Sequence, residues 1–183
     1  MKTNENIVAY VIRLAGTLLA ICLVVALCLA AVNSVTAPAI AKLNEEKTQA
    51  AIQAVLPGGG KEVEFVDETG LVSVVYKGEA GYAVQVAPGG FDGPITMMVG
   101  VDFDGNVLGI SVIKHTETAG LGAVAAATTS AGEAFRAGFV GQSGSVAVTK
   151  DGGVIDSITG ATITSRAVCA GVNAALDCIG SMG

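Results

Sequence analysis

The chain of 183 residues is long enough for one globular domain and one further element. Hydrophobic residues make up 51% of it, and the 10 lysines and arginines, in a chain of formal net charge -6, are scattered rather than clustered. A chain without a basic patch is not predicted to bind nucleic acid. The single histidine, His115, and the four cysteines show no zinc or haem spacing, so no metal site is predicted.

The stretch of residues 14–32, LAGTLLAICLVVALCLAAV, contains neither charge nor proline. At about 1.5 Å per helical residue, it spans close to the roughly 30 Å hydrocarbon core of a bilayer. We therefore predict one transmembrane helix at residues 14–35, preceded by a short tail at residues 1–13. A cleaved signal peptide is the alternative, but the apolar run is longer than that of a typical signal peptide and continues into a charged, helix-like segment.

The charges that flank this helix do not determine its orientation. Lys2 and Arg13 on one side are matched by Lys42 and Lys47 on the other, so the positive-inside count is a tie. Arg13 is interpreted as an interfacial anchor that reaches the lipid headgroups, because no charge follows it inside the run.

The four cysteines fall into two pairs. Cys22 and Cys28 lie in the apolar run, where cysteine is usually a small apolar side chain, with a contact to a redox partner as the alternative. Cys169 and Cys178 would lie about 13 Å apart along the axis of the last predicted helix, beyond the roughly 7 Å limit between the Cα atoms of a disulfide. No disulfide between them is expected unless that helix breaks.

Residues 36–60 keep apolar side chains at helical spacing up to Pro57, which three glycines follow. This pattern predicts a juxtamembrane helix and a linker. From Val63 to His115 the sequence changes to runs rich in β-branched residues, separated by glycine turns. Residues 104–106, Asp-Gly-Asn, are a strong hairpin signal between the last two runs, so we predict an antiparallel meander with one face packed on helices.

Beyond the meander, the pattern predicts short helices at 120–142, strands at 145–150 and 154–158, and an apolar helix at 163–179. No internal repeat is present. The order of strands followed by helices indicates an α+β domain, at residues 61–183.

The stretch DSITGAT, residues 156–162, stands where a predicted strand ends and the last helix begins. Backbone N–H groups and the helix dipole favour an anion at such a place. Taken alone, Thr159 and Thr162 are most simply turn or cap hydroxyls. The other interpretation is a covalent attachment point for a phosphate, which small neighbours such as Gly160 and Ala161 would let approach the chain.

This stretch resembles the recognition site of flavin transferase, which has the pattern Asp, two variable residues, Ser or Thr, Gly, Ala, Thr. That enzyme links flavin mononucleotide (FMN) through its phosphate to the last threonine. By this resemblance Thr162 is the attachment residue, and the rest of the recognition site comprises Asp156, Thr159, Gly160 and Ala161. The resemblance implies covalent FMN as the cofactor and a flavin transferase as the maturation partner.

A second stretch agrees with the first. KHTETAGLG, residues 114–122, is similar to the H-x-E-T-x-G-L-G segment of FMN-binding domains in two kinds of protein: the G subunit of the Rnf-type ferredoxin:NAD oxidoreductase and the C subunit of the sodium-pumping NADH:quinone oxidoreductase. The common family version has proline where this chain has Ala119, so the turn there is less constrained. The G subunit fits better, because the C subunit is usually a noticeably longer chain.

The resemblance implies a loop that packs along the flavin through Glu117, Thr118, Gly120, Leu121 and Gly122. By the same resemblance, Leu121 is an apolar surface for the ring, and Glu117 and Thr118 make polar contacts to it. Without the family, the same residues would be a solvent-facing strand end and a plain loop. Arg166, one turn after the attachment residue, is either a counter-charge for the phosphate or an exposed helix residue.

The resemblance implies a membrane-anchored redox subunit that passes electrons among other membrane and peripheral subunits of one complex. That complex couples ferredoxin and NAD chemistry to Na+ or H+ transport. The resemblance places the domain on the extracytoplasmic side of the cytoplasmic membrane. We predict a carrier without substrate chemistry of its own, since no general acid, base or nucleophile pair is apparent. The alternatives are a membrane-tethered binding module without flavin and a stand-alone membrane flavoprotein.

Overall fold

The computed structural model describes residues 2–67 and 69–182. Its helices, strands and 3-10 turns are, in chain order, α1 (Lys2–Val55), β1 (Lys61–Val63), β2 (Val72–Lys77), β3 (Tyr82–Val86), β4 (Thr96–Val101), β5 (Val107–Lys114), η1 (Gly122–Ala126), α2 (Ser130–Ala137), η2 (Thr149–Asp151) and α3 (Thr162–Met182). The chain divides into two compact units between Glu45 and Glu46.

The first unit consists of α1 up to Glu45. The helix begins at Lys2, so the described part of the predicted tail is helical. Among the described helices, only α1 is long and apolar enough to cross a membrane, with a mean hydropathy of 2.7 in its most apolar window. Hydroxyls in α1 donate to backbone carbonyls about one turn back, from Thr17 to Arg13, Ser34 to Ala31 and Thr36 to Val32. Each of these hydroxyls thus has a hydrogen-bond partner within the helix, as a polar group in an apolar environment requires.

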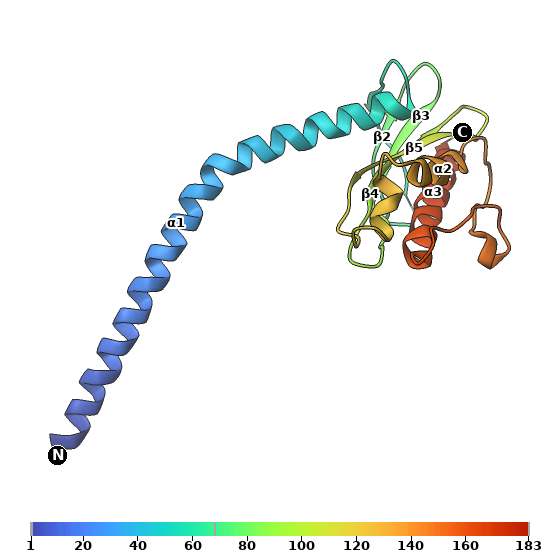
Figure 1. The fold of residues 1–183 in the computed structure, drawn as a ribbon. Helices are drawn as coiled ribbons and strands as arrows, with labels where there is room; N and C mark the ends of the chain where they lie inside the picture. The colour runs from blue at the N-terminus through green and yellow to red at the C-terminus, as the bar shows by residue number, and fades with distance from the viewer. Residues whose placement is uncertain (1, 68, 183) are drawn as a thin grey trace. The chain divides into compact units, whose positions relative to one another are not determined.

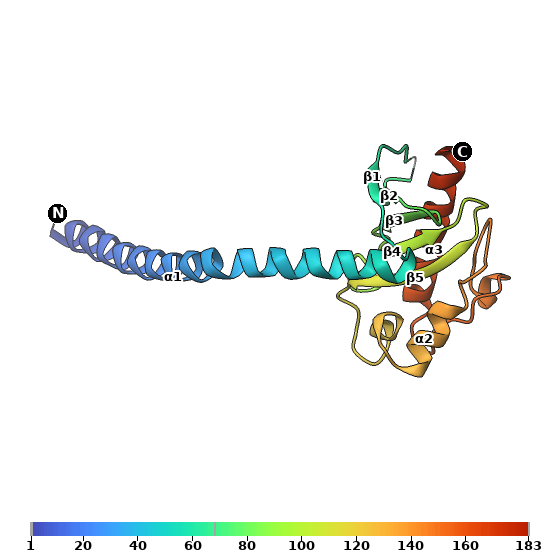
Figure 2. The ribbon, with the colours of Figure 1, turned by 90° about the horizontal axis from the view of Figure 1, so that it is seen from above.

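The second unit contains an antiparallel sheet with the order β1-β2-β3-β4-β5, and Figure 2 shows the strands in this sequence. Each strand pairs with the next, so the predicted meander and the α+β fold class are confirmed. The predicted hairpin turn is also present. Gly105 has a φ of +83°, and the Asp102 carboxylate accepts hydrogen bonds from the backbone N–H groups of Asp104 and Asn106.

Each face of the sheet has its own core. On one face, Val84 and Val86 of β3 and alternate residues of β4 pack with α3, which Figure 1 shows beside the sheet. On the other face, Ala83 and Met98 pack with the end of α1 and the residue after it, through Ala51, Ile52, Val55 and Leu56. The last turns of the helix predicted within residues 36–60 therefore pack in the core of the sheet domain.

The two strands predicted at 145–150 and 154–158 are wrong. A single parallel bridge joins Val148 to Ile155, and η2 begins directly after Val148. The alternation of apolar residues has another cause: Val146, Val148 and Ile155 are all buried in the core without a strand ladder. The predicted short helices and the last helix are confirmed as η1, α2 and α3.

Cys169 and Cys178 are free, buried thiols on α3. Burial raises the pKa of Cys169 to about 11 and also raises that of Cys178. We expect neither to react with N-ethylmaleimide at neutral pH in the folded protein, and both to react after denaturation, because the thiolate is the nucleophile. Peptide mass analysis of the labelled protein checks this, and rapid labelling of folded Cys169 would contradict it.

Candidate functional site

The site is built around the turn that leads into α3. The Ala161 N–H donates to the Ile158 carbonyl at 2.9 Å, and Gly160 between them has a φ of +77°. A Cβ atom at position 160 would lie 3.0 Å from the end of the Leu121 side chain. Gly160 is therefore needed for the turn and for the approach of Leu121. Thr162 is the first residue of α3 and is half-buried.

Ser165 fastens this turn to the helix, and the sequence pattern did not single it out. Its Oγ accepts from the Ile158 N–H at 3.0 Å and donates to the Ala161 carbonyl at 3.0 Å. The side chain is fully buried. A signal was present in the sequence, because a hydroxyl one turn into a helix is a common partner for the backbone that enters it.

A pocket of about 370 Å³ opens beside the turn and brings the two sequence motifs together. The predicted residues that line it are Glu117, Thr118, Leu121, Gly122, Gly160, Ala161 and Thr162. The lining residues not singled out from the sequence are Phe91, Lys150, Ile163 and Thr164. Phe91, Leu121 and Ile163 are large apolar side chains that remain exposed, so the pocket has apolar walls beside a hydroxyl-rich turn.

The other predicted residues lie on a different side of the turn. Asp156, Thr159 and Gly120 line a second pocket of about 440 Å³, together with residues of α2. Asp156 and Thr159 are exposed to solvent. Residues 156–162 are thus divided between two pockets, because Thr162 lines the first and Asp156 lines the second.

Glu117 joins three segments around the first pocket. One carboxylate oxygen accepts from the backbone N–H groups of Phe91 at 2.8 Å and Asp92 at 3.1 Å. The other accepts from the hydroxyl of Thr164 on α3. Burial alone would raise the pKa of Glu117, but these hydrogen bonds outweigh it, so the pKa lies below its ordinary value of 4.5. Both oxygens of Glu117 thus have partners within the protein, and its predicted contact with a flavin ring stays a prediction.

Glu117→Gln is expected to cost about 1–2 kcal/mol of stability at neutral pH, because the hydrogen bonds from Phe91, Asp92 and Thr164 would lose their charged acceptor. Since the folded pKa of Glu117 is lowered, its contribution is present above its unfolded pKa and is lost as the pH falls through the folded value. The difference between wild type and variant should therefore shrink below about pH 4. Denaturant unfolding followed by circular dichroism at several pH values measures it, and a difference independent of pH would contradict the assignment.

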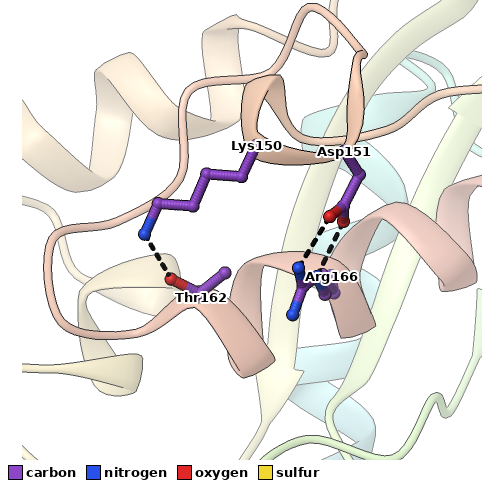
Figure 3. Close-up of polar contacts among 4 residues, drawn as sticks. All are labelled: Lys150, Asp151, Thr162 and Arg166. Carbon is purple, nitrogen blue, oxygen red and sulfur yellow. Dashed lines mark hydrogen bonds and ion pairs between the residues drawn. The ribbon is translucent and has the colours of Figure 1, made fainter.

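The 3-10 turn η2 lies beside the start of α3, as Figure 3 shows. The Lys150 ammonium group donates to Thr162 Oγ1 at 2.9 Å. Asp151 is bound by Arg166 through Nε at 2.7 Å and Nη2 at 2.6 Å. The hydrogen bond from Arg166 lowers the pKa of Asp151. Arg166 is thus an exposed helix residue paired with Asp151, and the cation at the Thr162 hydroxyl is Lys150, which lies 12 residues before it in the sequence.

Comparisons with known proteins agree with the geometry. The model of the FMN-binding domain family matches residues 90–177, which include both motifs and the first pocket. The G subunit of the Na(+)-translocating ferredoxin:NAD(+) oxidoreductase complex of Acetobacterium woodii is 35% identical over an alignment that covers 94% of this chain and 95% of that protein.

Two further relatives are each named as the G subunit of an ion-translocating oxidoreductase complex. The one from Methanosarcina acetivorans is 32% identical, with 88% of this chain and 90% of the relative covered. The one from Escherichia coli K12 is 34% identical, with 76% of each chain covered. The chain belongs to the family of G subunits of ion-translocating oxidoreductase complexes, as its two motifs indicated.

Proposed function

We propose that this chain carries FMN as a phosphoester on Thr162 and serves as an electron-carrying subunit of a ferredoxin:NAD oxidoreductase that transports Na+ or H+. The observation that carries the attachment is the position of the Thr162 hydroxyl. It lies on the wall of a pocket formed by both flavin-type motifs, 2.9 Å from a lysine ammonium group. The names of the relatives support the type of complex.

The residues present fit a flavin nucleotide. Thr162 begins α3, and the first intrahelical hydrogen bond runs from Ser165 N–H to the Ala161 carbonyl, so the N–H groups of residues 162–164 precede that ladder and favour an anion. Leu121 and Phe91 offer apolar surface for a ring. When bound, the flavin supplies one-electron or two-electron transfer, and a covalent bond keeps it from being lost.

The Thr162 hydroxyl needs an activated flavin nucleotide, because direct condensation with a free phosphate in water is unfavourable. With a phosphoanhydride donor such as FAD, Thr162 Oγ1 forms the new bond to the FMN phosphorus. The bond from that phosphorus to AMP breaks, AMP leaves with the electron pair, and the hydroxyl proton passes to a base and from there to solvent. No carboxylate accepts a hydrogen bond from Thr162 Oγ1 among the described residues, and Lys150 donates to it. A flavin transferase would therefore supply the base.

The remaining parts of the proposal concern location and partners. The apolar helix α1 would anchor the chain in the cytoplasmic membrane. The domain after it would lie on the extracytoplasmic side, beside other membrane and peripheral subunits of the complex.

The test is to co-express the full chain with a flavin transferase, denature it and measure its intact mass. The expected result is a gain of one FMN less one water, carried by the peptide that contains Thr162. An unmodified mass would contradict covalent attachment and favour a membrane-tethered binding module. A flavinylated chain that purifies from its native membrane free of integral membrane partners would favour the stand-alone flavoprotein instead.

A further inference from the structure

We propose that Lys150 is the counter-ion of the phosphate on Thr162, and that the ion pair between Asp151 and Arg166 keeps Lys150 available for that phosphate. This inference rests on the proposed attachment of FMN to Thr162. Lys150, Asp151 and Arg166 lie together at the start of α3 (Figure 3). In this inference Lys150 binds the phosphate, and Arg166 binds Asp151.

Lys150 lies beside the oxygen that would carry the phosphate. Its ammonium group is 2.9 Å from the oxygen that would become the bridging oxygen of the phosphoester. After esterification that oxygen has no proton, and the anionic oxygens of the phosphate lie only two bonds away from it. An ammonium group has three donors, so Lys150 can turn from the hydroxyl to these oxygens. Among the described residues that line the first pocket, Lys150 is also the only cationic one.

The backbone of Lys150 is held in place, unlike that of a lysine on an open surface loop. The N–H group of Thr149, just before it, donates to the Ile155 carbonyl at 2.8 Å. The N–H group of Asp151, just after it, donates to the Val148 carbonyl at 2.9 Å. A Cβ atom at Gly153, just after η2, would lie 2.0 Å from the Ala147 carbonyl oxygen. Only glycine fits there, so η2 keeps the close turn that presents Lys150 to α3.

Two carboxylates near Lys150, those of Asp151 and Glu117, could compete with a phosphate for its ammonium group. Asp151 is adjacent in the sequence, and both of its oxygens are taken by the guanidinium of Arg166. Glu117 lines the same pocket, and both of its oxygens accept hydrogen bonds from within the protein. Lys150 itself donates to the Thr162 hydroxyl. Arg166 therefore acts on the phosphate site indirectly, by occupying Asp151.

The experiment measures the rate at which the purified full chain in detergent is loaded by a flavin transferase from FAD, followed by intact mass. Lys150→Met is expected to load about tenfold more slowly, as the loss of one charge-assisted hydrogen bond implies. Lys150→Arg should restore most of the rate, and Lys61→Met, which removes a lysine from the exposed strand β1, should load like wild type. Loading of Lys150→Met at the wild-type rate would overturn the inference.

The ion pair is tested by a single variant and a double variant in the same assay. Arg166→Gln should slow loading, because the released Asp151 carboxylate then competes for Lys150. Arg166→Gln combined with Asp151→Asn should recover it, since the competitor is gone. A double variant as slow as Arg166→Gln would show that Arg166 acts in another way and overturn that part of the inference.

A contact with the transferase could also slow loading, so the loaded protein supplies a second readout. The 31P resonance of the phosphoester should shift in Lys150→Met and stay unchanged in Lys61→Met, whereas an unchanged resonance in Lys150→Met would overturn the inference. The thermal unfolding midpoint of the unloaded chain should be the same in both variants. If wild type gains no flavin on Thr162, the proposed function fails and this inference falls with it, whereas normal loading of both wild type and Lys150→Met overturns this inference alone.

Discussion

Thr162→Val is expected to emerge from co-expression with a flavin transferase at its unmodified mass, whereas the wild-type chain gains one FMN less one water. Valine has nearly the shape of threonine but no hydroxyl, so the only bond that holds the flavin cannot form. Thr162→Ser keeps a hydroxyl at the same place and should still be modified. The loss in Thr162→Val should be complete rather than partial, because no weaker contact replaces a covalent bond.

A matched substitution shows whether the loss is specific. Thr128 is an exposed threonine that lines neither pocket, and Thr128→Val removes a hydroxyl by the same change of shape. This variant should carry the full mass gain on the peptide that contains Thr162. A modified Thr162→Val chain would place the acceptor elsewhere and refute the assignment of Thr162, even if the protein still contained flavin.

Gly100→Ala is expected to destabilise the domain by roughly 3 kcal/mol, at the upper end of the range for overpacking in a core. A Cβ atom at position 100 of β4 would lie 2.5 Å from the carbonyl oxygen of Val55 and 2.9 Å from its Cβ. Both contacts are to atoms near the backbone, so no side-chain rotation can relieve them. The sheet and the last turn of α1 would have to move apart and open the core around Ile52 and Leu56. Denaturant unfolding followed by circular dichroism measures the loss.

Gly109→Ala is the control, because Gly109 of β5 pairs directly with Gly100 in the sheet. Its added methyl group would meet only the end of the Val55 side chain, at 3.9 Å, which is ordinary contact. Replacing this glycine should leave stability unchanged or raise it by up to about 1 kcal/mol, since the unfolded chain loses freedom. Equal losses in the two variants would show that the strands themselves, and not the contact with α1, demand glycine.

The parts of the fold that could be predicted from sequence are those set by local pattern. Runs of β-branched residues between glycines indicated the antiparallel meander, and residues 104–106 indicated the hairpin between β4 and β5. The same reasoning wrongly predicted two strands in residues 145–158. Val146, Val148 and Ile155 alternate like a strand because they point into a core, and burial produces that alternation whether or not a neighbouring strand completes the ladder.

The position of a site residue in the fold was predictable where its place in a motif determines it. Thr162 at the start of a helix and the small residues before it follow from the pattern of residues 156–162. Lys150 and Phe91 could not be found in this way, because they reach the pocket from separate segments through the tertiary fold. Pattern alone also could not show that Arg166 is paired with the Asp151 carboxylate. The cation that contacts the Thr162 hydroxyl is instead Lys150.

The turn before α3 has a consequence for the order of biogenesis. Its shape depends on Ser165 from within the helix, and the pocket beside it is completed by Leu121 from a distant loop, so the surface around Thr162 does not exist in a nascent, unfolded chain. On the proposed function, the maturation enzyme would act on a domain that has already folded. The flavin would then be a late addition, made in the compartment where the domain resides, and an unloaded folded chain would be the normal precursor.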